Sequence, residues 1–210
     1  MNTVDFDTKA EAWDAHTARV KRAEKIYDSI AAEISIHASD RVLDFGCGTG
    51  LLGFHFINAV TRVTFADTSA GMLEQVRKKA ELLPKGKADT LNLAEQALRN
   101  TYSIIVSLLA LHHVENVEET LCRLSELVAQ DGYICLSDLD LEDGSFHYPD
   151  VAPHNGIDRE EVLRNLRKNG IRILCNKTVF IEEKVVNGEH KTYPIFLIAG
   201  QKQSTYSPHE

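Results

Sequence analysis

The sequence predicts an α/β fold, a doubly wound and mostly parallel sheet with helices on both faces. Apolar, strand-like segments alternate with amphipathic, helix-like segments through most of the chain, and a glycine-rich turn follows the first of these strands. Such alternation is typical of parallel strands joined by helical crossovers. Near the end of the chain, Asn187-Gly188 separates two β-rich segments, a strong signal for an antiparallel hairpin. We therefore expect a parallel sheet with a terminal antiparallel hairpin.

The first expected elements are one or two amphipathic helices within residues 9–36, which would form an N-terminal helical cap over residues 1–38. Their expected apolar side carries Trp13, Val20, Ile26, Ile30 and Ile34. Strands are then expected near residues 41–45, 62–66, 88–93, 102–107 and 132–137, and helices near 50–59, 70–82 and 116–129. This order of elements is the basis of the predicted fold class.

The last quarter of the chain has a different pattern. Residues 158–168 are expected to form a helix with Asp158 as its N-cap. Residues 171–186 and 192–201 are expected to form the two strands of the hairpin. Asp131-Gly132 predicts a turn before the fifth strand of the sheet.

Length and composition limit the class of protein. The chain has 210 residues, of which 43% are hydrophobic and 26% charged, as in a globular domain with a sizeable core. We expect one domain over residues 1–202 and a disordered tail over 203–210. The formal net charge of −8, without a run of Lys or Arg, argues against a nucleic-acid partner.

Location is also predicted from the sequence. The N-terminal residues lack the basic and apolar regions of a signal peptide, and no segment approaches the length of a membrane span. The four cysteines lie far apart and have no zinc-type spacing, so we expect buried thiols in a reducing compartment. They are Cys47, Cys122, Cys135 and Cys175. We expect a cytoplasmic protein without a membrane partner.

The first strand runs directly into the most informative segment, in which Gly46, Gly48 and Gly50 follow the carboxylate of Asp44. Glycines remove the Cβ atoms that would keep the backbone away from a ligand. A dinucleotide site would have the spacing GxGxxG, whereas this loop has GxGxG. With a carboxylate directly before it, the loop favours a cationic ligand without phosphate.

Residues 42–50, VLDFGCGTG, resemble motif I of the class I S-adenosylmethionine-dependent methyltransferases. The resemblance continues at Asp67, which ends the second predicted strand seventeen positions after Gly50. It covers nearly the whole chain, and residues 137–147 and 153–156 are similar to small bacterial methyltransferases of unassigned substrate. It implies a seven-stranded sheet whose seventh strand inserts between the fifth and sixth.

The same resemblance implies a set of residues that bind S-adenosylmethionine and release S-adenosylhomocysteine as product. Asp67 is expected to accept hydrogen bonds from the ribose hydroxyls. Asn92 is expected near the adenine amino group, with Asp89 or Glu95 as alternatives. The set comprises Trp13, Asp44, Gly46, Cys47, Gly48, Thr49, Gly50, Asp67, Thr68, Ser69, Met72, Asn92, Leu93 and Leu108. For Trp13 a place in the core is the alternative, and it is the commoner one for such a residue.

Histidines after the fourth and fifth strands are the candidate catalytic residues, namely His112, His113 and His147, and His154 is a further candidate base. A base is needed only if the methyl acceptor must lose a proton, and a thiolate acceptor would need none. The expected acceptor is a small molecule, and apolar residues on that side favour an aromatic or quinol-like one. Apolar residues expected on that side are Leu108, Leu109, Leu111, Phe146 and Tyr148.

Other interpretations of the sequence lead to different functions. A non-catalytic, regulatory protein that binds S-adenosylmethionine is the main alternative, whereas the GxGxG loop and the hairpin disfavour a nicotinamide-dependent oxidoreductase. We expect no metal. A magnesium site at Asp138, Asp140 and His147 would require oxygen ligands that converge at about 2.1 Å. The acceptor, the methylated atom and the oligomeric state are left open.

Overall fold

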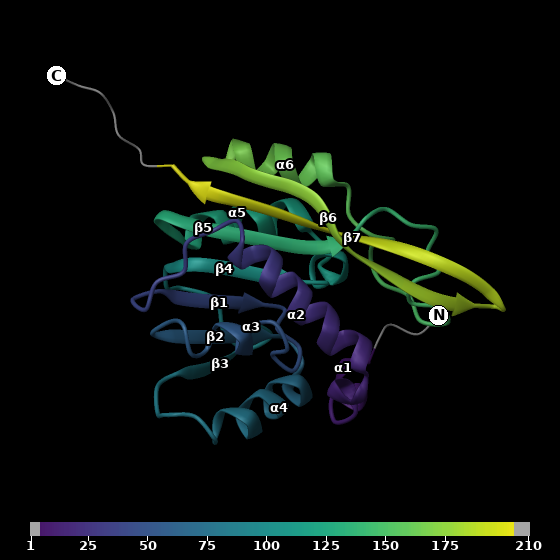
Figure 1. Cartoon of the computed structure of the whole chain (residues 1–210), viewed down its shortest axis with the longest axis horizontal. Helices are drawn as coiled ribbons and strands as arrows, with labels where there is room; N and C mark the ends of the chain where they lie inside the picture. Colours follow the sequence, from purple (N-terminus) through teal and green to yellow (C-terminus); the bar gives the residue numbers. More distant parts are fainter. Residues whose placement is uncertain (1–4, 204–210) are drawn as a thin grey trace.

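The computed structural model describes residues 5–203, which form a seven-stranded sheet between two layers of helices (Figure 1). The strand order is β3-β2-β1-β4-β5-β7-β6. The strands are β1 (Arg41–Phe45), β2 (Arg62–Asp67), β3 (Ala88–Asn92), β4 (Tyr102–Leu108), β5 (Val128–Leu139), β6 (Ile171–Val186) and β7 (Glu189–Lys202). Strands β1 to β5 pair in parallel, and β7 is antiparallel to both β5 and β6. The predicted mostly parallel sheet with a terminal hairpin is confirmed.

Helices cover both faces of this sheet and separate its buried residues into two clusters. The helical elements are α1 (Phe6–Lys9), η1 (Trp13–Ala15), α2 (Thr17–Ala31), α3 (Gly53–Phe56), α4 (Ala70–Ala80), η2 (Leu111–His113), α5 (Val117–Leu127) and α6 (Arg159–Lys168). Residues of α2, α3 and α4 share one cluster, around Val42 and Phe65. Residues of α5 and α6 share the other, around Leu43 and Phe196. Because neighbouring residues of a strand point to opposite faces, Val42 and Leu43 belong to different clusters.

The hairpin that inserts β7 into the sheet follows from local turn chemistry. Asn187 and Gly188 both have positive φ, of 52° and 84°, the backbone conformation of a tight hairpin turn. Strand β7 begins directly after this turn, three residues earlier than expected, because Glu189 pairs with Val186. Helix α6 begins as predicted, with the Asp158 side chain accepting a hydrogen bond from the backbone N–H of Glu160.

Three expectations about the elements are wrong. The helix expected over residues 50–59 is reduced to α3, since Gly50 has a φ of 84° and completes a turn. Asp131 and Gly132 lie within β5, in a bulge where a Cβ on Gly132 would lie 2.7 Å from the Ser103 carbonyl oxygen. Val20, expected on the apolar side of the N-terminal helices, is 38% exposed.

Further expectations concern the ends of the chain and its cysteines. The expected tail falls almost entirely outside the described residues, as do residues 1–4 of the expected cap. Cys47 and Cys135 are buried, Cys122 and Cys175 are partly exposed, and all four are free thiols. Within residues 5–203 there is no helix with the length and hydropathy needed to cross a membrane.

Candidate active site

A pocket of about 950 Å³ lies where the carboxyl ends of β1, β2 and β4 meet the N-terminal helices and the loop after β5. Its volume is at the upper end of the range for small-molecule sites, about 300–1,000 Å³. The structure brings fourteen of the predicted site residues to its wall: Trp13, Asp44, Gly46, Cys47, Gly48, Thr49, Asp67, Thr68, Met72, Leu93, Leu108, His112, His113 and His147. Gly50, Ser69 and Asn92 are not among the lining residues.

The glycine-rich loop forms the floor of one end of this pocket. The backbone N–H groups of Gly46 and Cys47 donate hydrogen bonds to the Ala66 carbonyl oxygen, at 2.8 and 3.1 Å, which holds the loop against β2. A Cβ on Gly48 would meet only the Met72 sulfur, 3.9 Å away. The face of Gly48 is thus open, and a ligand can approach its backbone closely.

Asp67 joins the two loops that follow β1 and β2. Its Oδ2 accepts a hydrogen bond from the Gly48 N–H at 2.7 Å, and its Oδ1 accepts one from the Ser69 N–H at 2.9 Å. Burial raises the pKa of this carboxyl above its usual value, and the backbone hydrogen bonds oppose the shift. Each oxygen has further lone pairs for a ligand hydroxyl.

Asp44 is a buried carboxylate with one unpartnered oxygen. Its Oδ2 accepts a hydrogen bond from the Gly53 N–H at 2.9 Å, whereas Oδ1 has no partner within the described part of the chain. Burial raises the pKa of Asp44 to about 7. An unpartnered buried oxygen on the pocket wall is suited to a ligand that carries positive charge or a hydrogen-bond donor. Burial also raises the pKa of the neighbouring Cys47 thiol well above its usual value, which keeps it protonated.

The three predicted residues that do not line the pocket have structural contacts instead. Gly50 packs against Phe54 and Phe65, where a Cβ would lie within 2.9 Å of either ring. Ser69 caps α4 through the Met72 N–H. The Asn92 side chain is bonded within its own loop, to the Ala94 N–H and the Glu95 carboxylate.

The alternatives to Asn92 are placed elsewhere as well. Asp89 lies near the start of β3, paired with Thr64 of β2, and forms an ion pair with Arg62 at 2.8 Å. Glu95 is exposed and accepts the hydrogen bond from Asn92. Neither side chain lines the pocket, whereas Leu93 does.

The sequence analysis did not identify the polar contacts that hold the N-terminal segment over the glycine loop. Asp14 accepts a hydrogen bond from the Thr49 hydroxyl at 2.5 Å. Asp7 accepts hydrogen bonds from the Ser69 hydroxyl and the Gly71 N–H, at 2.5 and 2.7 Å. The Arg19 guanidinium lies 3.7 Å from the centre of the Trp13 ring, on the pocket wall. No motif marks Asp7 or Asp14, because their contacts join segments far apart in the sequence.

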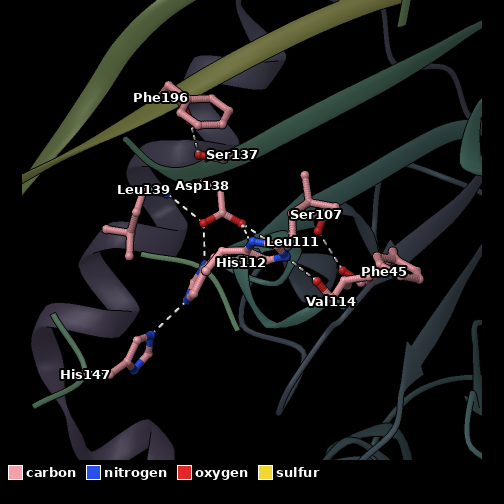
Figure 2. A network of polar contacts seen from close by, with 11 residues as sticks. Phe45, Ser107, Leu111, His112, Val114, Ser137, Asp138, Leu139, His147 and Phe196 are labelled. Carbon is pink, nitrogen blue, oxygen red and sulfur yellow. Dashed lines mark hydrogen bonds and ion pairs between the residues drawn. The ribbon is translucent and has the colours of Figure 1, made fainter. Parts of the chain in front are cut away.

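Three imidazole rings also line the pocket. His112 and His113 belong to η2, after β4, and His147 lies in the loop after β5. Asp138 Oδ1 accepts a hydrogen bond from His112 Nδ1 at 2.5 Å, and His112 Nε2 lies 2.9 Å from His147 Nε2 (Figure 2). Burial, and then the neighbouring His112, lower the pKa of His113 to about 2 and that of His147 to about 4. Both rings are therefore neutral at pH 7.

The acidic residues of the magnesium hypothesis are engaged elsewhere. Asp138 is fully buried and also accepts a hydrogen bond from the Leu111 N–H at 2.8 Å (Figure 2). Asp140 forms an ion pair with Arg159. The set of Asp138, Asp140 and His147 is thus not assembled as a cation site in the described residues.

Two further expectations for this end of the pocket are not met. His154 Nε2 lies 2.9 Å from the Val114 carbonyl oxygen, and the residue does not line the pocket. Leu111, expected on the acceptor side, is fully buried in the second core cluster. Leu111 belongs to η2 but packs into the core cluster shared by α5 and α6, whereas the adjacent His112 lines the pocket.

A cluster of charged residues borders the pocket beside the hairpin. Arg22 of α2 and Glu182 of β6 form an ion pair at 2.7 Å with only 10% and 11% of their side chains exposed. Lys184 lies 3.4 Å from the centre of the Phe146 ring and donates a hydrogen bond to the Phe146 carbonyl oxygen at 2.8 Å. Burial lowers the pKa of Lys184 to about 8.

Comparison with known proteins agrees with this fold. A family model described as a methyltransferase domain matches residues 43–134. An uncharacterized methyltransferase of Schizosaccharomyces pombe is 28% identical over 147 residues, which cover 61% of this chain and 51% of the relative. An uncharacterized methyltransferase of Oceanobacillus iheyensis is 30% identical over 130 residues, which cover 60% of this chain and 60% of the relative. The matched regions thus span about half to three fifths of these relatives.

Solved structures share the fold at low sequence identity. A putative methyltransferase of Bacillus halodurans has a TM-score of 0.70 at 14% identity and covers 85% of this chain and 99% of its own. Magnesium protoporphyrin IX methyltransferase of Synechocystis, solved with bound SAH, has a TM-score of 0.67 at 18% identity, with 97% and 90% covered. Residues 43–134 thus match a methyltransferase domain, and the whole fold is one that these methyltransferase structures share. The chain is similar to the class I S-adenosylmethionine-dependent methyltransferases.

Proposed function

We propose that this protein transfers a methyl group from S-adenosylmethionine to a small-molecule acceptor. The observation that carries the proposal is one pocket lined by two chemically different groups of residues. The glycine loop, Asp44 and Asp67 are one group, and three histidines are the other. A volume of about 950 Å³ is sufficient for a nucleoside cofactor together with a small acceptor.

The residues at the glycine loop fit S-adenosylmethionine. The unpartnered Oδ1 of Asp44 would face the cationic part of the cofactor, and the open face of Gly48 allows close contact with the backbone. Asp67 would accept hydrogen bonds from the ribose hydroxyls, and Leu93 would contact the adenine. When bound, the cofactor supplies a methyl group on a sulfonium, whose leaving group is a neutral thioether that needs no proton.

The task of the chain is to align the acceptor with that methyl group and to exclude water. Orientation alone can supply roughly 7–11 kcal/mol of the barrier lowering. The bond between acceptor atom and methyl carbon forms as the carbon–sulfur bond breaks, so a hydroxyl acceptor must also lose its proton. The neutral rings of His113 and His147 line the pocket as hydrogen-bond acceptors for such a hydroxyl, and Asp138 orients His112 beside them.

An aromatic or quinol-like acceptor is supported by the apolar surface near the histidines. Leu108, Leu109, Phe146 and Tyr148 line this part of the pocket. A ubiquinone biosynthesis O-methyltransferase of Schizosaccharomyces pombe is 28% identical over 109 residues, 50% of this chain and 40% of that protein. Its name adds support for a phenolic hydroxyl as the methylated group.

A cytoplasmic location and the lack of a nucleic-acid partner belong to the same proposal, on the basis of charge and composition.

Calorimetric titration with S-adenosylmethionine, S-adenosylhomocysteine and NADH tests the cofactor first. Binding of the first two without binding of NADH is the expected result, and a screen of phenols, catechols, thiols and amines would then follow, with methylated product detected by mass spectrometry. Binding of NADH alone would overturn the proposal. Tight cofactor binding with no transfer to any acceptor would favour the alternative, a non-catalytic regulatory protein.

A further inference from the structure

The three histidines at the acceptor end converge in the way that metal ligands do. One ring nitrogen from each of His112, His113 and His147 lies within 4.8 Å of the other two. Within residues 5–203, no other set of three or more His, Cys, Asp or Glu side chains converges in this way. The two chain segments are joined at this point although His112 and His147 are 35 positions apart.

The buried carboxylate of Asp138 fixes the orientation of the central ring. It accepts the hydrogen bond from His112 Nδ1, so the other nitrogen, Nε2, presents a lone pair toward His147 (Figure 2). A carboxylate behind a histidine is a frequent arrangement at metal sites, where it sets the tautomer and makes the imidazole a stronger ligand. Asp138 is itself held by the backbone N–H of Leu111 and is fully buried.

The distances need only a small adjustment to accept an ion. His112 Nε2 and His147 Nε2 are 2.9 Å apart, whereas nitrogens bound tetrahedrally to zinc at 2.0–2.1 Å are about 3.3 Å apart. Rotation of the His147 ring, which lies in a loop, can supply these few tenths of an ångström. No hydrogen bond to the His113 ring is found within the described residues, and one of its nitrogens already lies within 4.8 Å of the other two ligand atoms.

We propose that His112, His113 and His147 bind a divalent transition-metal ion such as Zn²⁺, with Asp138 as the residue that positions His112. Imidazole is a preferred ligand of Zn²⁺, Fe²⁺, Co²⁺ and Ni²⁺, whereas Mg²⁺ prefers oxygen ligands. Three protein ligands leave at least one coordination position, as in catalytic zinc sites. Because the same three rings line the pocket, that position is available to a molecule bound there.

The site has a consequence for the acceptor, which rests on the proposed methyltransferase function. A bound transition-metal ion lowers the pKa of a coordinated hydroxyl or thiol, so that the proton leaves to water or buffer and the oxygen or sulfur becomes a nucleophile at neutral pH. The acceptor class would then be molecules that present a phenol, catechol or thiol to the ion. Binding of the ion by the three histidines does not itself depend on a bound acceptor or on its deprotonation.

Metal binding is tested on the full chain after dialysis against a chelator. Isothermal titration with Zn²⁺, and visible absorption with Co²⁺ as a spectroscopic probe of nitrogen coordination, should both give one site per chain, and Mg²⁺ should give none. His147→Ala and His113→Ala should each weaken Zn²⁺ binding at least tenfold, and Asp138→Asn about 10- to 100-fold. Circular dichroism and thermal melting identify any variant that fails to fold.

His190→Ala is the matched control, because His190 is exposed and does not line the pocket. It should bind Zn²⁺ as the parent chain does. The absence of Zn²⁺ and Co²⁺ binding to the parent, or equal binding by the folded His147→Ala variant, would overturn the metal site. Titration with S-adenosylhomocysteine on the same samples separates the two proposals, since cofactor binding without metal rejects only the metal site, and metal binding without cofactor rejects only the proposed function.

Discussion

The carboxylate of Asp67 accepts a hydrogen bond from the backbone N–H of Gly48, 2.7 Å away, and thereby ties the loop after β1 to the tip of β2. Through its other oxygen it also holds the Ser69 N–H, at the start of α4. One side chain thus shapes the glycine loop and stands on the pocket wall as the candidate ribose ligand. Loss of its charge should affect both roles.

We expect Asp67→Ala to weaken S-adenosylhomocysteine binding about 10- to 100-fold, because a charge-assisted hydrogen bond is worth roughly 1.5–3 kcal/mol. Isothermal titration measures the effect. Asp89→Ala is the control, since that carboxylate forms an ion pair with Arg62 outside the pocket and its loss should leave affinity unchanged. Equal affinities for both variants would remove Asp67 from the site.

The raised pKa of Asp44 predicts that cofactor affinity depends on pH. With a pKa of about 7 in the free protein, Asp44 is largely protonated at pH 6 and ionised at pH 8. A cationic ligand favours the ionised form, so affinity for S-adenosylmethionine should rise with pH through about 7 and then level off. Calorimetric titrations from pH 5.5 to 8.5 would measure the affinity for S-adenosylmethionine at each pH. Asp44→Asn should bind weakly with a flat profile, and a parent profile just as flat would contradict the prediction.

The same pKa shift predicts the pH dependence of stability without ligand. The folded state binds the Asp44 proton more tightly than the unfolded state does, since the pKa rises from 3.8 to about 7. This contribution to the free energy of unfolding is therefore present at low pH and is lost as pH rises from about 4 to 7. Asp44→Asn, which carries no charge, should melt at a higher temperature than the parent at pH 8, with the difference shrinking toward pH 5. A difference that does not change with pH would contradict this reasoning.

At Gly46 the backbone conformation and the lack of space for a Cβ both require glycine. Its φ is +65°, and a Cβ there would lie 2.2 Å from the Ala110 Cβ, on the loop that leads to the histidines. Gly46→Ala should therefore cost more than the strain of a left-handed backbone, about 1–2 kcal/mol. Gly188→Ala is the control, with a φ of +84° but no atom near its Cβ. Urea unfolding should show the larger loss for Gly46→Ala, and similar losses would mean that the Ala110 loop moves aside freely.

Local signals explain which elements could be predicted from the sequence. The bounds of β1 and the turn at Asn187-Gly188 agree with expectation, because both depend on neighbouring residues only. The short α3 and the bulge at Gly132 do not, because the first depends on Asp44 holding the Gly53 N–H and the second on the Ser103 carbonyl of β4. Tertiary contacts overrode the local pattern at both places.

The residues of the site also fall into those that local signals predict and those that depend on contacts between distant segments. The glycine loop and Asp67 could be predicted, since a motif of fixed spacing places them at adjacent strand ends. The contact of Asp14 with Thr49 spans 35 positions, and that of Arg22 with Glu182 spans 160, so no spacing indicates either. For Asn92 the family resemblance alone implies a contact with the adenine, and its side chain is bonded within its own loop.

The Arg22–Glu182 ion pair gives the last prediction, which concerns how α2 is fixed to the hairpin beside the pocket. Both side chains are about nine-tenths buried, and Arg22 Nε has no partner within the described residues. Breaking such a pair on one side leaves a buried charge and typically costs about 3–5 kcal/mol, whereas replacing both partners by apolar residues is often close to neutral.

We therefore expect Arg22→Met to lower the free energy of unfolding far more than the double variant Arg22→Met with Glu182→Leu. Urea unfolding of the two single variants and the double variant gives the coupling energy. The Lys168–Glu118 pair is the control, since both of its side chains are mostly exposed and removing Lys168 should cost less than about 1 kcal/mol. A cost for Arg22→Met as small as that control would show that water reaches Glu182 once the guanidinium is gone, and that α2 is fixed over the pocket by its apolar contacts rather than by this ion pair.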